Sequence, residues 1–289
     1  MSAGSIAPGG RSDPPSGRIR LLVSDIDGTL VTRDKRLTPG VLAAAGRLRE
    51  AGIRLALVSS RPARGMDMFI EPLALDTPRA GLNGGEILAP DGTLLSRLPL
   101  AADAARETLE TLDAYGVEPW LFAEGEWLIR PHAEGPAGGP FAEREFRAVR
   151  LPPTVVEDFS AHHHRIGKIM GSSNDHPLLE RVERELQERL GARVNAHRSQ
   201  LYFLDVTNPE ANKGRAALEL ARLLDVAPDE MACIGDMGND ISMLDVAGLA
   251  IAMGNGTEEV RQAAHLVTAS NEEDGWALAV DRLLLPRRP

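Results

Sequence analysis

The chain has 289 residues and a formal net charge of -10, from 32 basic and 42 acidic side chains. This acidic balance argues against a general nucleic-acid surface, because such surfaces neutralise phosphates with lysine and arginine. The composition, 43% hydrophobic and 26% charged, is that of a folded protein. At about 150 residues per domain, the length suggests roughly two domains. The one cysteine, Cys233, cannot form an internal disulfide, which favours a reducing, cytoplasmic location over a disulfide-stapled secreted fold.

The first 17 residues are rich in glycine, serine and proline and contain no continuous apolar stretch. We therefore expect a flexible tail without a secretory signal, and interpret the fold from residue 18 onward. No apolar run approaches the length of about 20 residues that spans a bilayer, so no membrane partner is expected.

The N-terminal part of the chain predicts a strand, a helix and a second strand. An apolar run over 19–24 is of strand length and ends at Asp25. Thr38 and Pro39 are typical of a helix start, and a second apolar run follows over 53–58. Continuous apolar strands joined by a helix indicate a parallel sheet that is covered on both faces.

The same pattern returns near the C-terminal end. A helical stripe of alanine and leucine covers 216–224, and a short apolar strand over 231–234 leads to Asp236. Further short strands are predicted over 249–253 and 265–269. Both ends of the chain therefore predict a Rossmann-like α/β core.

The middle of the chain differs from both ends. Residues 85–207 mix alternating strands with one clear helix over 178–190, and include a stretch rich in proline and glycine over 131–140. We interpret this part as an α+β domain inserted between the two core segments, 18–84 and 208–289.

Acidic and hydroxyl side chains follow the predicted core strands. Ligands gather at the carboxyl ends of the strands in an open parallel sheet. Those ends carry Asp25, Asp27, Ser59, Asp236 and Asp240. Four carboxylates brought together repel one another unless a cation compensates them, and ligand sets made only of oxygen favour Mg²⁺.

Two carboxylates beside Mg²⁺ can carry out phosphoryl transfer in two steps. One can attack phosphorus to form an aspartyl-phosphate, and the other can protonate the leaving oxygen and later activate water. A turn at Gly28 can aim Asp25 and Asp27 at one substrate, and lets the backbone of Gly28 and Thr29 approach its phosphate.

Two further residues complete the set of groups that phosphoryl transfer needs. Ser59 supplies a hydroxyl and a backbone N–H, and Lys213, at the start of a predicted helix, supplies a positive charge for the phosphoryl oxygens. Helix starts normally favour acids, so a lysine there suggests a nearby anion.

The motifs around these residues resemble those of the haloacid dehalogenase superfamily. The resemblance rests on Asp25–Leu30 (DIDGTL), the strand-terminal Ser59, Asn212–Gly214 (NKG) and Gly235–Asp240 (GDMGND). Asn83–Gly85 (NGG) and Ile251–Asn255 (IAMGN) narrow it to the Cof-type phosphatases of subclass IIB, in which a large α+β cap domain of type C2B lies between the second and third motifs.

The resemblance implies a role for each acidic residue. Asp25 would be the nucleophile and a Mg²⁺ ligand, and Asp27 the general acid and base, with its backbone carbonyl on the metal. Asp236 would be the third protein ligand, and Asp240 would support the metal directly or through water. Phosphate or substrate contacts would come from Gly28, Thr29, Ser60, Arg61, Asn83, Gly84 and Asn239.

The sequence departs from the family's pattern at the second motif. Ser59 stands where the family often has threonine, and Ser60 where it has glycine. Because serine still presents a hydroxyl, we expect altered packing and retained activity.

The inserted domain contains a run of three histidines, His162–His164. On a strand, neighbouring side chains point to opposite faces and cannot all bind one ion, so we interpret the run as a polar segment of the cap. Arg165 and Lys168 are candidates for contact with an anionic substrate. Cys233 is interpreted as a small core residue.

The leading hypothesis is a Mg²⁺-dependent phosphatase acting on a small phosphorylated metabolite, a sugar phosphate ahead of nucleotide and cofactor phosphates. A phosphomutase uses the same intermediate, and a receiver-like signalling module combines similar residues. A binding protein that has lost catalysis is disfavoured because every catalytic group is present. The sequence leaves the oligomeric state open.

Overall fold

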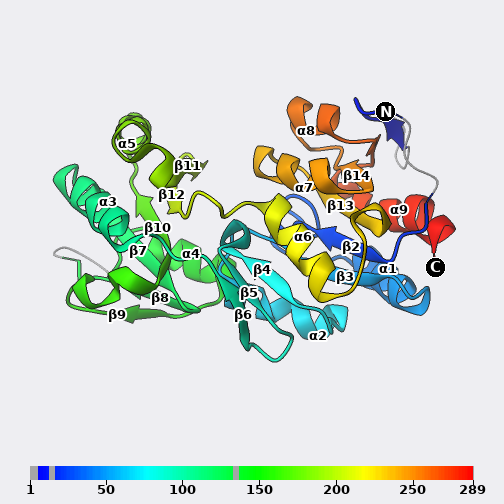
Figure 1. The fold of residues 1–289 in the computed structure, drawn as a ribbon, viewed down its shortest axis with the longest axis horizontal. Helices are drawn as coiled ribbons and strands as arrows, with labels where there is room; N and C mark the ends of the chain where they lie inside the picture. Colours follow the sequence, from blue (N-terminus) through cyan, green and yellow to red (C-terminus); the bar gives the residue numbers. More distant parts are fainter. Residues whose placement is uncertain (1–5, 13–16, 133–136, 289) are drawn as a thin grey trace.

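The computed structural model describes residues 6–12, 17–132 and 137–288. These residues form two lobes, with the core at one end and the inserted domain at the other (Figure 1). The core sheet has six strands, and all its neighbouring pairs are parallel except the one that β1 forms. In spatial order these strands are β1 (Ala7–Pro8), β15 (Leu266–Val267), β14 (Leu249–Ala252), β13 (Met231–Gly235), β2 (Leu21–Ser24) and β3 (Arg54–Leu57).

Helices cover both faces of the core sheet. Because side chains alternate along a strand, Leu22 packs on one face of β2 while Leu21 and Val23 pack on the other. The first face lies against α1 (Pro39–Glu50), α9 (Gly275–Ala279) and the π-helical turn Val280–Leu284. The second lies against α6 (Lys213–Leu223), α7 (Ile241–Val246) and α8 (Glu258–Ala263). The predicted α/β core with parallel strands is confirmed.

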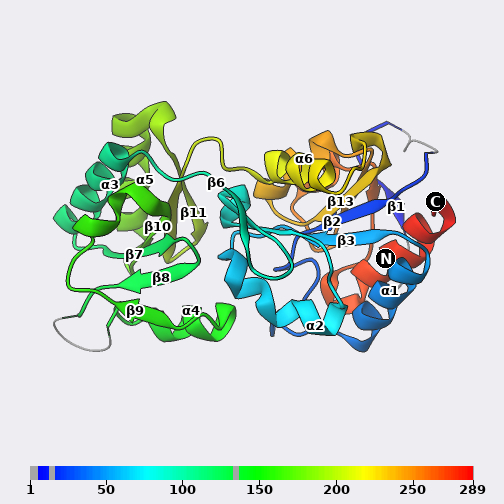
Figure 2. The ribbon, with the colours of Figure 1, turned by 60° about the horizontal axis from the view of Figure 1, so that its bottom comes forward.

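The inserted domain has its own six-stranded sheet, with helices on both sides (Figure 2). Helices α3 (Ala102–Ala114) and α5 (His176–Leu190) pack on one face through aliphatic side chains, and α4 (Ala142–Val149) lies toward an aromatic cluster on the other. In spatial order its strands are β11 (Asn195–Gln200), β12 (Phe203–Thr207), β10 (Ile166–Ser172), β7 (Glu118–Ala123), β8 (Glu126–Ile129) and β9 (Pro153–Val155).

A third, three-stranded antiparallel sheet lies between the two lobes. It consists of β4 (Arg79–Gly81), β5 (Glu86–Leu88) and β6 (Leu94–Arg97), with α2 (Ile70–Leu73) nearby. The range 85–207 expected for the inserted domain thus includes two strands, β5 and β6, that belong to this third sheet. We propose that the inserted domain itself runs from α3 to β12, and call this part the cap.

Short 3₁₀ turns join many of these elements. They cover Ala63–Phe69, Leu82–Gly84, Ser160–Arg165, Gly191–Arg193, Pro228–Glu230, Gly238–Asp240, Asn271–Glu273 and Leu285–Arg287. The strand assumed for the three histidines is therefore wrong, because they lie on the 3₁₀ turn Ser160–Arg165. Among the described residues, they do not belong to any group with metal-ligand geometry.

The expectation of a flexible tail is wrong for Ala7 and Pro8. These two residues form β1, which pairs antiparallel with β15 at the edge of the core sheet. The rest of that expectation falls partly on residues 1–5 and 13–16, which lie outside the described residues. No helix of the described chain is long and apolar enough to cross a membrane.

Candidate active site

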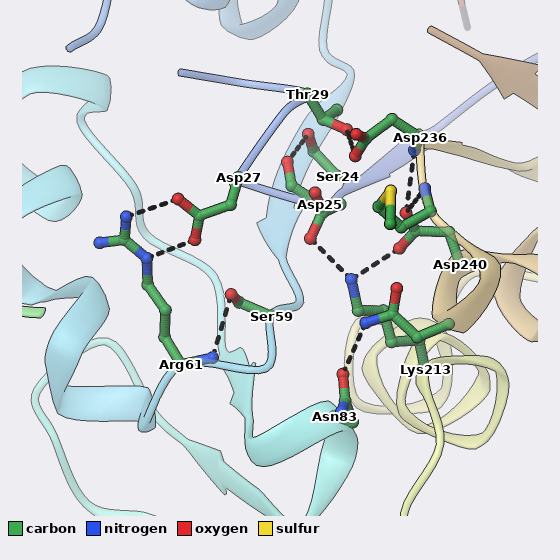
Figure 3. Close-up of polar contacts among 12 residues, drawn as sticks. Ser24, Asp25, Asp27, Thr29, Ser59, Arg61, Asn83, Lys213, Asp236 and Asp240 are labelled. Atoms are coloured by element: carbon green, nitrogen blue, oxygen red, sulfur yellow. Dashed lines mark hydrogen bonds and ion pairs between the residues drawn. The ribbon is translucent and has the colours of Figure 1, made fainter. Parts of the chain in front are cut away.

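Three acidic side chains meet at the carboxyl edge of the core sheet. Strands β2 and β13 are parallel neighbours with Ser24 opposite Ile234, so the residues that follow them, Asp25 and Asp236, leave the sheet side by side. One carboxylate oxygen from each of Asp25, Asp236 and Asp240 lies within 4.8 Å of the others (Figure 3). The structure therefore brings together three of the four acidic residues predicted from the sequence.

Lys213 places a positive charge inside this cluster. Its Nζ lies 2.6 Å from Oδ1 of Asp25 and 2.6 Å from Oδ1 of Asp240. Helix α6 starts at Lys213, and the Asn212 side chain caps it by accepting from the N–H of Arg215. The anion suggested by a lysine at this helix start is thus a pair of carboxylates in this structure.

Burial dominates the electrostatics of the cluster. It raises the pKa of Asp25 to about 8 against the opposing charge of Lys213, and raises the pKa of Asp236 to about 6 with the help of Asp240. For Lys213, burial acts to lower the pKa, but the two carboxylates outweigh it and raise the pKa above its ordinary value. One ammonium does not fully compensate three buried carboxylates.

The cluster fits a hard divalent cation. Its donors are carboxylate oxygens alone, the ligand type that Mg²⁺ prefers, and a cation would offset the charge that Lys213 leaves uncompensated. Asp240 has a second task, because its Oδ2 accepts the backbone N–H groups of Asp236 and Met237, each at 2.9 Å. Asp240 thereby fixes the turn that carries Asp236.

The carboxylate of Asp27 points away from the cluster (Figure 3). Arg61 binds it with two hydrogen bonds, Nε to Oδ2 at 2.6 Å and Nη2 to Oδ1 at 2.7 Å, and Lys35 adds Nζ to Oδ1 at 2.6 Å. Although burial would raise it, Arg61 and Lys35 hold the pKa of Asp27 well below its usual range. Asp27 is thus ionised in this structure.

Gly28 and Thr29 bind the cluster to the loop that follows β2. Gly28 has φ +85°, and a Cβ there would lie 2.3 Å from Oδ2 of Asp236, so this position requires glycine. Thr29 donates from Oγ1 to Oδ1 of Asp236 at 3.1 Å. Thr29 therefore supports Asp236, and Gly28 leaves room for it beside the catalytic cavity.

Other predicted phosphate contacts lie in three different places. Ser59 is buried near the start of the loop that follows β3, where its Oγ accepts the N–H of Arg61 at 3.2 Å. Asn239 donates from Nδ2 to Oδ1 of Asn83 at 3.1 Å, so these two residues are in contact; their binding of phosphate stays a prediction. Gly84 instead lies against α6, beside a different cavity between β5, β6 and that helix.

Two buried charged residues hold the loop that carries Ser59 and Arg61. Glu86 accepts the N–H of Ala63 at 2.7 Å, and Arg79 donates from Nε to the carbonyl of Ala63 at 3.1 Å. The backbone N–H and carbonyl of Ala63 are thereby both held by side chains from strands β4 and β5. Burial raises the pKa of Glu86.

Sequence reasoning missed some residues at the site. Asn255 donates from Nδ2 to the carbonyl of Gly28 at 2.8 Å and to Oδ2 of Asp236 at 3.3 Å. Its position just beyond the end of β14 was the available signal. Lys35 gave no such signal, because nothing in its local sequence indicates a contact with Asp27.

Two adjoining cavities lie between the core and the cap. The catalytic cavity, about 490 Å³, is lined by the acidic cluster, Lys213 and cap residues 197–200. The cap cavity, about 320 Å³, shares Asp27, Arg33 and Lys35 with the first and extends toward α4 and β12. Both fall in the size range of small-molecule sites.

Comparison with known proteins places this chain in a family. A model described as haloacid dehalogenase-like hydrolase matches residues 22–280. The chain belongs to this family. The hydrolase is 27% identical over 268 residues to pyridoxal phosphate phosphatase YbhA of Escherichia coli (strain K12), covering 89% of this chain and 96% of the relative.

Solved structures agree with this family. A haloacid dehalogenase-like hydrolase from Bacteroides thetaiotaomicron matches with a TM-score of 0.83 and 28% identity, over 92% of this chain and 100% of the other. The subclass IIB sugar phosphatase BT4131, at 21% identity, shares the fold with a TM-score of 0.78 over 92% of this chain and 99% of the other. The predicted family and the enzyme class, a phosphoric monoester hydrolase, are confirmed.

Proposed function

We propose that this hydrolase removes phosphate from a small phosphorylated metabolite, with a sugar phosphate as the first candidate, through an aspartyl-phosphate on Asp25 and with Mg²⁺ as cofactor. The observation that carries the proposal is the cluster of Asp25, Asp236 and Asp240 around Lys213, at the carboxyl edge of a parallel sheet. The cytoplasmic location stays a prediction.

Asp25 is the proposed nucleophile. Its carboxylate lines the catalytic cavity, and Lys213 at 2.6 Å favours the ionised form that attack on phosphorus requires. The phosphoryl oxygens would be held by Lys213, by the hydroxyl of Ser59 and by the backbone N–H groups after β2.

Asp25 and Asp236, with the backbone carbonyl of Asp27, would hold the metal. Bound Mg²⁺ would supply positive charge that compensates the carboxylates and the phosphoryl group during transfer. Asp240 would keep Lys213 and the Asp236 turn in position, and Asn255 would orient Asp236 through its hydrogen bond.

Asp27 is the proposed general acid and base. Its ionised carboxylate is in the form that activates water in the second step. Protonation of the leaving oxygen in the first step requires the neutral form, so Arg61 and Lys35 must turn from Asp27 toward the substrate when it binds. Both cations line the cap cavity, where an arriving anion would compete with Asp27 for them.

The test is phosphate release from a panel of phosphorylated sugars, nucleotides and cofactor precursors, with Mg²⁺ or EDTA. The proposal predicts release that depends on the metal and is absent in Asp25→Asn. A folded protein that releases no phosphate from any compound would favour a phosphomutase or a signalling module. Isotope-labelled water separates these outcomes, because hydrolysis puts the label into released phosphate.

A further inference from the structure

The cap cavity carries an acidic wall that the proposed reaction does not use. Glu145 of α4 and Asp205 of β12 line it from the cap, together with Lys168 of β10. The core side of the same cavity is formed by Asp27 and Arg61, so a substrate whose phosphate is at Asp25 would extend its leaving group toward this wall. The wall is therefore placed to contact the leaving group.

Asp205 has a carboxylate oxygen without a partner. Its Oδ2 lies 3.3 Å from Nζ of Lys168, but its Oδ1 is buried and accepts no hydrogen bond from any described residue. The side chain as a whole is almost fully buried, at 1% exposure. Because buried polar atoms are nearly always hydrogen-bonded, an unpartnered oxygen on a residue that lines the cap cavity is unusual, and a small shift of the side chain on ligand binding would give it a donor.

Glu145 is a second acceptor in the same wall. It is buried at 9% exposure, and within the described part of the chain its carboxylate accepts no hydrogen bond. The charges that act on it are those of Lys168, Asp205, Arg61 and Asp27, and burial raises its pKa. Like Oδ1 of Asp205, the Glu145 carboxylate receives no hydrogen bond from the described residues.

Lys168 is the hydrogen-bond donor in this wall of the cap cavity. Besides Asp205, its Nζ reaches the carbonyl of Ser60 at 3.2 Å and lies 4.8 Å from the ring centre of Phe122. It is thus fixed in place between the cap and the loop after β3. One ammonium beside two carboxylates offers both donors and acceptors, with an excess of acceptors.

The cations of the cap cavity lie mostly toward the core. Arg33 and Lys35 also line the catalytic cavity, where the substrate phosphate would arrive, and Arg61 is bound to Asp27. On the cap side, Arg144 is held over the ring of Tyr202, 4.2 Å from its centre. At the end of the cavity formed by Glu145, Asp205 and Lys168, two carboxylates meet one ammonium, so a second anionic group is less favourable there than beside Arg33 and Lys35.

We propose that Glu145 and Asp205 accept hydrogen bonds from hydroxyl groups of the leaving group, and that they select neutral, polyhydroxylated leaving groups over those that carry a carboxylate or a second phosphate. This inference rests on the proposed phosphatase function. Hydroxyls satisfy the two unpartnered acceptors, whereas a second anion would lie beside like charges, which is a common way to reject a wrong ligand.

The test compares Glu145→Gln with the wild type on matched substrates. The pairs are glucose 6-phosphate against 6-phosphogluconate and glycerol 3-phosphate against 3-phosphoglycerate, and p-nitrophenyl phosphate serves as a substrate without hydroxyls. The matched control is Glu143→Gln, on the same helix, where the side chain is 72% exposed and pairs with Arg147. Asp205→Asn is a second variant.

The wild type should prefer the neutral member of each pair in kcat/KM. Glu145→Gln should reduce that preference by about tenfold or more. Glu143→Gln should leave the preference unchanged and hydrolyse p-nitrophenyl phosphate at the wild-type rate. Asp205→Asn, where it folds, should reduce the preference in the same direction.

Two results would overturn the inference. One is a wild type that hydrolyses p-nitrophenyl phosphate but does not favour the neutral member of either pair, and the other is an unchanged preference in Glu145→Gln. Both leave the proposed function standing. A folded wild type that hydrolyses none of the five compounds with Mg²⁺ would instead refute the proposed function, and the inference with it.

Discussion

Replacing Lys213 with methionine removes the one ammonium that lies between two buried carboxylates. The side chain is 2% exposed, and its Nζ is 2.6 Å from both Asp25 and Asp240. Methionine fills similar space without the charge, so the variant isolates the electrostatic contribution.

The magnitude follows from the burial of the partners. Asp25 and Asp240 are 5% and 0% exposed at the side chain, so neither can turn to water when the ammonium is lost. Removing one partner of a buried ion pair costs about 3–5 kcal/mol. Burial already raises the pKa of Asp25 to about 8, so Asp25 can take up a proton when the ammonium is removed. This keeps the loss of unfolding free energy within that range. Activity should fall roughly 100- to 1,000-fold, as for loss of a group that stabilises charge in the transition state.

The assay is urea denaturation in EDTA at neutral pH, so that bound metal does not replace the missing charge. Arg222→Met is the control, because Arg222 pairs with Glu219 on the surface of α6 and its loss should have no measurable effect. Adding Asp240→Asn to Lys213→Met should restore part of the stability, since it removes a carboxylate that has lost its partner. An unfolding free energy of Lys213→Met equal to that of the wild type would refute the reasoning.

Two further variants test other parts of the structure. His265 accepts the N–H of Ala250 through Nδ1 at 2.9 Å, and burial lowers its pKa, so the folded protein keeps it neutral while the unfolded chain protonates it near pH 6.5. Its contribution to stability is present above that pH and is lost as the pH falls. His265→Asn, which keeps an acceptor in place of Nδ1, should therefore lose less stability than the wild type between pH 7.5 and pH 5, as measured by urea denaturation; identical pH profiles would contradict this assignment. Asn255→Ala removes the hydrogen bonds to Gly28 and Asp236, and should weaken Mg²⁺ binding about 10- to 100-fold in calorimetric titration. Wild-type affinity in that variant would show that Asn255 does not orient Asp236.

The sequence predicted the core and its acidic edge because both depend on local patterns. Apolar runs of strand length can be recognised in a sequence. Residues that directly follow such runs lie at the carboxyl edge of a parallel sheet, as Asp25 and Asp236 do. The start of α1 was also readable, since Thr38 caps it and Pro39 occupies its first turn.

Other features depend on contacts between distant segments and could not be read locally. Glu145 looks like an ordinary helix residue, and only the tertiary fold buries it near Lys168 and Asp205, which lie on strands later in the chain. The short strand β1 was missed because its two residues are flanked by turn-forming sequence and gain a partner only at β15. The direction of the Asp27 side chain is set by Arg61, which lies 34 residues further along the chain.

The most direct test of the proposed mechanism is to trap the phosphorylated enzyme. Asp27→Asn should still be phosphorylated by an activated substrate with Mg²⁺ but should hydrolyse the intermediate slowly, because the group that activates water is gone. After rapid acid quenching, peptide mass spectrometry is predicted to find one phosphoryl group, on Asp25. A phosphoryl group on another residue, or phosphate release without any phosphorylated enzyme during the turnover, would contradict the assignment of Asp25 as the nucleophile.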